Sequence, residues 1–209
     1  RIRNEGIIWN YKRIRRVYKM LGMNKRKRTR KRITGRIKIP LAIPASENDT
    51  WSMDFMHDVL MNGRKFRTLN IIDDFNREAL AVDAYFSIGS KRVVMVLDRI
   101  IRERGVPRMI RVDNGPEFIC SILSDWCYEK GISLHFIQPG KPNQNSYIER
   151  FNRSYRQDVL DIHLFENIDQ VRYYTDVFLE DYNLHRPHES LNDLSPINYK
   201  LKKTECEFF

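Results

Sequence analysis

The chain has 209 residues, a formal net charge of +10 and 42% hydrophobic residues. This length allows one medium-sized domain with a small appendage. The sequence has no run of about eighteen apolar residues and no N-terminal apolar stretch before a small-residue cleavage site, which argues against a membrane span and a signal peptide. Its three cysteines lack paired spacing, as is typical of free thiols in a reducing compartment. We therefore expect a cytoplasmic protein without a membrane partner.

The charge is distributed unevenly along the chain. Residues 1–40 hold sixteen Lys and Arg against the single acid Glu5, a net charge of +15, which leaves −5 for residues 41–209. Each Lys or Arg beside a phosphate releases a counterion, so such a basic head is typical of proteins that bind nucleic acid. A solubilising or localisation tail is the alternative, but residues 25–38 contain no acid. We predict DNA contacts from Lys25, Arg26, Lys27, Arg28, Arg30, Lys31 and Arg32.

A short amphipathic helix is the first expected element. Gly22 lies where a residue in the left-handed conformation would end this helix. The following stretch, residues 23–48, has little apolar periodicity and is interpreted as a linker whose order depends on DNA. The apolar residues that recur at helical spacing are Ile7, Tyr11, Ile14, Tyr18 and Leu21.

Three antiparallel strands are expected next. Residues 51–60 are β-like, and Asn62-Gly63 predicts a two-residue hairpin turn into a strand over residues 65–72. A second turn, Asp74-Phe75-Asn76, leads into a strand over residues 79–86.

Helices and strands then alternate. A helix is expected over residues 90–104, with Ser90 as its N-cap and Gly105 after its end, followed by a short strand over residues 109–112. The buried face of this helix is expected to carry Val94, Leu97 and Ile101.

Pro116 and Gly131 are expected to bracket a single helix, followed by a strand over residues 132–137. A long helix from about Asn143 and a last helix over residues 169–182 complete the chain. The order β-β-β-α-β-α-β-α indicates an α/β fold. The apolar stripe predicted for the long helix is Ile148, Phe151, Tyr155, Val159 and Ile162.

Three acids occupy positions that suggest chemistry. Asp54 interrupts an apolar strand, where an acid is disfavoured unless it is paired, metal-bound or turned to water at an edge. Asp113 follows a strand at its carboxyl end, where open α/β sheets place their sites, although Asp-Asn-Gly is also an ordinary turn. Glu149 lies beside the buried Ile148 on the long helix and would, alone, be an ordinary surface glutamate.

Together, Asp54, Asp113 and Glu149, with thirty-five residues between the last two, resemble the DDE triad of retroviral-integrase-like recombinases. The element order is that of the ribonuclease H-like fold, so we expect a five-stranded mixed sheet flanked by helices. The surrounding motifs resemble bacterial transposases of the insertion-sequence-three family: WSMDF at 51–55, NIIDDFNRE at 70–78, IRVDNGPEF at 110–118, QPGKPNQNSYIERFNRSYR at 138–156 and YNLHRPHESL at 182–191.

The resemblance implies a domain organisation and an activity. Residues 1–24 would end a helical DNA-binding segment, residues 25–48 form a basic linker, residues 49–200 the catalytic core with C-terminal helices, and residues 201–209 a tail. The activity would be DNA strand cleavage at element ends and transfer of the freed 3′-hydroxyl, carried out by a homo-multimer on DNA. Three gathered carboxylates require cations, and oxygen ligands favour Mg²⁺ or Mn²⁺, with two ions expected.

Supporting roles are predicted for several polar residues. Asn145, Arg153 and Arg156 are spaced to share the helical face of Glu149 and are predicted DNA contacts, as is Lys141 in the preceding loop; a solvated helix face is the alternative. Glu117 is interpreted as a first-turn helix glutamate.

Two further groups of residues are not expected to be metal ligands. Asp73 and Asp74 are interpreted as turn acids close to the site. His185 and His188 flank a proline and have no nearby Cys pair, which argues against zinc.

Two rival functions remain open from the sequence. A nuclease of the same fold would use the same metals without strand transfer, although the basic head and the residues around Glu149 argue against it. A degenerate transposon remnant would bind DNA without cutting it, although the complete triad argues against that.

Overall fold

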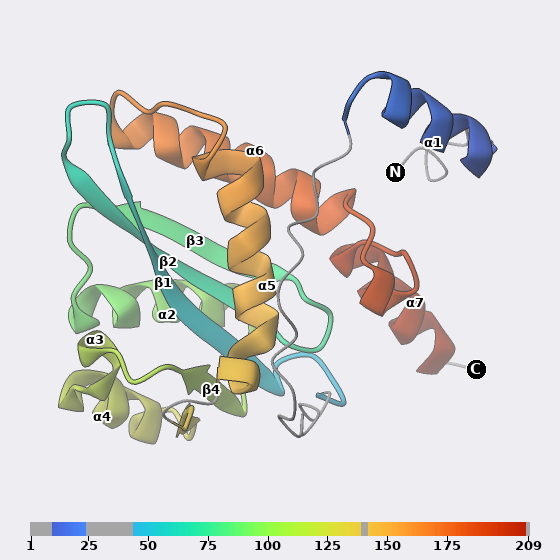
Figure 1. Cartoon of the computed structure of the whole chain (residues 1–209). Helices are drawn as coiled ribbons and strands as arrows, with labels where there is room; N and C mark the ends of the chain where they lie inside the picture. The colour runs from blue at the N-terminus through green and yellow to red at the C-terminus, as the bar shows by residue number, and fades with distance from the viewer. Residues whose placement is uncertain (1–9, 24–43, 139–141, 208–209) are drawn as a thin grey trace. The chain divides into compact units, whose positions relative to one another are not determined.

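The computed structural model describes residues 10–23, 44–138 and 142–207 (Figure 1). The chain divides into two compact units, residues 1–40 and residues 41–209. The predicted DNA contacts in residues 25–32, and the one at Lys141, fall outside the described residues. Within the described part of the chain, no helix is long and apolar enough to cross a membrane.

Helix α1, Tyr11–Met20, confirms the predicted amphipathic helix in the first unit. The Asn10 side chain caps it by accepting a hydrogen bond from the Lys12 backbone N–H at 2.9 Å. Gly22 adopts a φ of +65°, the left-handed conformation expected after the helix. Ile7, also predicted for this helix, lies outside the described residues.

The second unit is built on a five-stranded sheet with the order β3-β2-β1-β4-β5. Strands β1 to β3 pair antiparallel, whereas β4 pairs parallel to both β1 and β5. The predicted mixed sheet is therefore confirmed. Its strands are β1 Thr50–Val59, β2 Lys65–Asp73, β3 Ala79–Tyr85, β4 Met109–Val112 and β5 Ser133–Phe136.

Helices cover both faces of this sheet, and each face has its own apolar core. Helices α2 Ser90–Arg104, α3 Pro116–Ile119 and α4 Ser121–Glu129 pack on a core that includes Trp51 and Met53. Helices α5 Ser146–Tyr155 and α6 Ile168–Leu184 pack on the other core, which includes Met56 and Phe66. In Figure 1, α5 lies across β1 and β2.

Two turn and cap predictions need correction. The β1–β2 connection has three residues, Met61 to Gly63, between Leu60 and Arg64, whose backbone groups are hydrogen-bonded at 2.9 Å. Gly63 takes the left-handed position (φ +78°) that a three-residue hairpin requires. Ser90 is the first residue of α2 and not its N-cap, because its hydroxyl donates to the Glu117 carbonyl at 2.7 Å.

Two helix predictions were also wrong. The expected single helix after Pro116 is interrupted at Cys120, whose extended backbone separates α3 from α4. The long helix is preceded by a 3₁₀ turn, η1 Pro142–Asn145, and followed by a π-helical turn, η2 Arg156–Leu160. This wider turn changes which side chains face the core, so Leu160 is buried and the predicted core residue Ile162 is 65% exposed.

A further helix, α7 Pro196–Glu207, was not predicted. Its sequence signal is Ser195-Pro196, because Pro is favoured in a first helical turn and the Ser195 hydroxyl accepts from the Asn198 backbone N–H at 3.4 Å. Between α6 and α7 the chain makes a 3₁₀ turn, η3 Glu189–Leu191, and an isolated bridge between His188 and Leu194.

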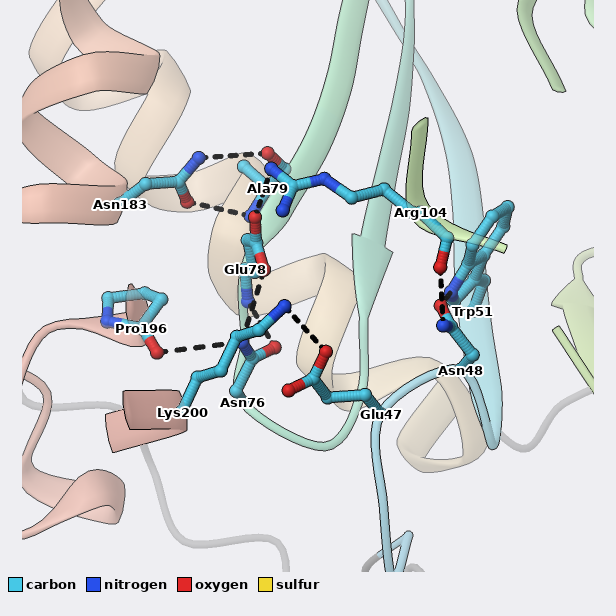
Figure 2. Close-up of polar contacts among 10 residues, drawn as sticks. All are labelled: Glu47, Asn48, Trp51, Asn76, Glu78, Ala79, Arg104, Asn183, Pro196 and Lys200. Carbon is cyan, nitrogen blue, oxygen red and sulfur yellow. Dashed lines mark hydrogen bonds and ion pairs between the residues drawn. The ribbon is translucent and has the colours of Figure 1, made fainter. Parts of the chain in front are cut away.

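Polar contacts join the helical C-terminal part to the turn between β2 and β3 (Figure 2). The Asn183 side chain on α6 accepts from the Ala79 backbone N–H and donates to the Ala79 carbonyl, both at 2.9 Å. Beside it, the buried Glu78 carboxylate accepts from Asn76 at 3.2 Å and forms an ion pair with Arg104 at 2.5 Å. The Asn183 bonds attach α6 to β3 at the edge of the sheet, and the Glu78 ion pair attaches the β2–β3 turn to α2.

Candidate active site

Asp54 lies in the middle of β1 on the side covered by α5. Its Oδ1 accepts from the Phe55 backbone N–H, and its Oδ2 accepts from the Asn152 side chain, both at 2.8 Å. Asn152 in turn accepts from Asn70 on β2 at 2.7 Å. Because Asn70 is completely buried, this chain of amides holds the Asp54 carboxylate in one orientation.

The two asparagines were missed by the sequence analysis. Asn70 directly faces Asp54 across the β1–β2 ladder, a pairing that follows only once the register is known. A partial signal exists, because Asn70 interrupts an apolar strand as Asp54 does, and Asn152 lies one helical turn after Glu149.

Asp113 follows β4 immediately. The parallel ladder pairs Ser52 with Arg111, so Asp54 and Asp113 each lie two residues further along neighbouring strands. Asp113 Oδ1 accepts from the Gly115 backbone N–H at 2.9 Å. A Cβ on Gly115 would lie 3.0 Å from that same oxygen, so glycine allows this close turn.

Glu149 lies in the first turn of α5 and is exposed. Burial raises its pKa, and the neighbouring Arg153 acts in the opposite direction. The pKa of Asp54 rises further, to about 6, mainly through burial, with repulsion from Asp113 and from Glu149 adding to the rise. Asp113 and Glu149 therefore both lie close enough to Asp54 to repel its carboxylate.

The donor chemistry of these residues fits a hard divalent cation, because every candidate ligand atom is a carboxylate oxygen. The raised pKa of Asp54, due mainly to burial and also to repulsion from two nearby acids, means that its negative charge is unfavourable in the metal-free fold. Within the described ranges, no three or more His, Cys, Asp or Glu side chains are already gathered closely enough to hold a metal ion. The assignment of Asp54, Asp113 and Glu149 as metal ligands therefore stays a prediction.

Comparison with known proteins identifies the family. Two models of the integrase core domain match the chain, over residues 44–142 and residues 130–196. A protein of insertion element IS407 from Burkholderia multivorans is 39% identical over 201 residues, covering 96% of this chain and 73% of that protein. The chain belongs to the insertion-element transposases with an integrase core domain.

A second relative and a solved structure extend this finding. A protein of insertion element IS476 from Xanthomonas euvesicatoria is 39% identical over 91% of the chain, which spans only 55% of that longer protein. The HTLV-2 integrase catalytic core domain in complex with magnesium (trimeric form) is 18% identical, with a TM-score of 0.56 over 77% of this chain and 99% of that domain. This likeness confirms the predicted ribonuclease H-like fold.

The predicted DNA-contact residues of this transposase occupy different environments. Arg153 is exposed on α5. Arg156 is 40% exposed and donates to the His57 carbonyl at 2.9 Å, with an ion pair to Asp58 at 3.3 Å. Asn145 does not share an exposed face with them, because it ends the 3₁₀ turn before α5 and is 3% exposed.

The remaining acids have structural partners. Glu117 forms an ion pair with Arg67, and this contact lowers its pKa. Asp73 pairs with Trp51 across the ladder, and the Asp74 backbone N–H donates to the Thr50 carbonyl at 2.9 Å, so both acids lie near the start of β1. Their expected closeness to the candidate site stays a prediction.

Proposed function

We propose that this chain is the catalytic core of a DNA transposase that cleaves a strand at the element end and joins the freed 3′-hydroxyl to target DNA. Asp54, Asp113 and Glu149 are the proposed catalytic residues. The observation that carries the proposal is the closeness of Asp113 and Glu149 to Asp54: burial raises the pKa of Asp54 most, and repulsion from each of the other two acids raises it further.

Each acid has its own structural support. Asp54 is oriented by Asn152 and Asn70, Asp113 by the backbone of Gly115, and Glu149 is presented from the first turn of α5. The same three carboxylates would hold Mg²⁺ or Mn²⁺, two ions in the proposed site. Bound there, such ions lower the pKa of a water or hydroxyl nucleophile and stabilise the charge that develops on the leaving oxygen.

DNA contacts of the proposed complex extend beyond the carboxylates. Arg153 follows Glu149 on α5, Arg156 begins the π-helical turn η2 directly after it, and Lys141 precedes the helix in the sequence. Asn145, being buried, is proposed to act by shaping the turn that presents α5. The basic run over residues 25–32 is proposed to bind DNA phosphates without reading sequence.

The complete protein is proposed to act as a homo-multimer, because transposition requires two element ends to be brought together. The domain organisation proposed from the sequence is retained: a helical segment to residue 24, a basic linker to residue 48, the catalytic core to residue 200 and a short tail.

The test is incubation of the complete protein with labelled element-end DNA, a target duplex and Mg²⁺. Both nicked and joined products are expected. Asp54→Asn, Asp113→Asn and Glu149→Gln should each abolish both products while DNA binding persists. Nicks without joined products would favour the nuclease alternative, and binding without either product would favour an inactive remnant.

A further inference from the structure

A polar cavity lies on a different side of α5 from the face that meets Asp54. Its volume is about 280 Å³, and its wall is formed by α5, the β2–β3 turn and the segment that follows α6. Three arginines contribute to this wall: Arg77, Arg150 and Arg186. Arg77 belongs to the motif NIIDDFNRE, Arg150 to IERFNRSYR and Arg186 to YNLHRPHESL. None of these three arginines has a role in the proposed chemistry.

The three guanidinium groups act on one small region. All three lower the pKa of His188, which burial and this positive surrounding together bring to about 4. The positive charge of the same three arginines also acts to lower the pKa of the Tyr182 hydroxyl, which lines the cavity as well. Burial, together with the positive charge of the three arginines, thus keeps the imidazole of His188 neutral.

The protein neutralises this charge only in part. Arg186 forms an ion pair with Asp158, and Glu189, which also lines the cavity, brings a second carboxylate to its wall. Arg77 is 8% exposed, stacks on the Tyr147 ring at 3.5 Å, and keeps a buried Nη1 for which the structure shows no hydrogen-bond acceptor. Arg150 is exposed, and no ion pair of its guanidinium occurs among the described residues.

Arg77 is also held in an unfavourable backbone conformation. Its φ of +64° lies in the left-handed region, which residues with a Cβ rarely adopt. This conformation places the guanidinium under Tyr147 at the cavity wall. A strained residue that carries a buried, incompletely bonded charge is typical of a binding site.

We propose that this cavity binds a phosphate of the DNA backbone, with Arg150 as the direct ligand and Arg77 and Arg186 supplying the positive field. The site is separate from Asp54, because Arg150 lies about 100° around α5 from Glu149. The inference deepens the proposed function, since it assigns a second DNA contact to the same transposase.

The test measures binding of this chain to a labelled 30-base-pair duplex of arbitrary sequence, in chelator, over a series of salt concentrations. Arg150→Gln should make the slope of log affinity against log salt shallower by about 0.9, the change expected for one lost phosphate contact. Ser154→Glu places a negative charge at the cavity wall, so it should lower the affinity for DNA and also make the salt slope shallower. Arg102→Gln is the matched control, because Arg102 is exposed on α2 at the opposite face of the sheet.

The outcomes separate this inference from the proposed function. A slope change for Arg150→Gln and Ser154→Glu, but not for Arg102→Gln, supports the phosphate site. Unchanged slopes overturn it, and the proposed function still stands if the wild-type protein nicks and joins element-end DNA. Loss of a multimer in sedimentation, with an unchanged slope, also overturns it and assigns the cavity to an acidic side chain of a second copy.

Discussion

Replacing Asp54 with Asn should stabilise the metal-free protein at neutral pH. The pKa of Asp54 rises from its ordinary 3.8 to about 6 on folding, because the carboxylate is buried and faces Asp113 and Glu149. A raised pKa means that the folded state prefers the protonated acid, so the fold loses stability as the pH rises from 3.8 through 6. The charged form therefore destabilises the fold above this window.

The magnitude follows from the two pKa values. At about 1.36 kcal/mol per pKa unit, the full destabilisation is about 3 kcal/mol, of which about 2 kcal/mol develops between pH 4.5 and 7.5. The substitution also brings the new amide against the Asn152 amide that donates to Asp54. Losing or reversing that hydrogen bond costs about 1 kcal/mol at every pH. The net gain at pH 7.5 should thus be about 2 kcal/mol.

Urea unfolding in chelator, at intervals from about pH 4.5 to about pH 7.5, measures this difference. Asp125→Asn controls for the loss of one negative charge, because Asp125 is exposed on α4. The free energy of unfolding of Asp54→Asn relative to wild type should increase across this range. A difference that stays constant with pH would refute the reasoning, because it would show that Asp54 does not titrate differently in the fold.

Three further outcomes are expected. Asn183→Ala removes both hydrogen bonds to the Ala79 backbone and should lower the free energy of unfolding in urea by about 1–3 kcal/mol. Arg111→Met leaves the fully buried Asp74 without its 2.6 Å partner and should cost about 3–5 kcal/mol at pH 8. The cost should be smaller at pH 5, because the pKa of Asp74, about 6 with Arg111 in place, rises further when Arg111 is removed, and the acid then takes up a proton. Mg²⁺ at a hundredfold excess over its Kd should stabilise the wild type by about 2.7 kcal/mol in a thermal melt, and Asp113→Asn should reduce this response.

The sequence predicted the sheet well because its strands carry strong local signals. Each strand begins and ends beside residues with marked turn preferences, such as Gly63 and Asn76, and the buried faces follow the apolar pattern. The candidate triad was also accessible, since Asp54 breaks an apolar strand and Asp113 follows one. These features depend on residues that are close in the sequence.

The features that sequence reasoning missed depend on contacts between distant residues. Ser90 has an ordinary cap sequence, but its hydroxyl bonds to Glu117, which is 27 residues away. The π-helical turn after Tyr155 has no simple residue signature and shifts the buried face by one residue. The support of Asp54 by Asn70 and Asn152 requires the register of β1 with β2 and the placement of α5 at the same time.

Helix α5 explains how one short element can serve two polar sites. Its ten residues span about 15 Å, and successive side chains point about 100° apart. Glu149 and Asn152 therefore lie on the side of α5 that meets Asp54, while Arg150 and Ser154 line the polar cavity. Phe151 and Tyr155 between these faces are fully buried against α6, so the helix cannot rotate without exposing its core side chains. A DNA strand bound at both faces would thus be held in a fixed relation to the catalytic acids, which is the condition that in-line attack at phosphorus requires.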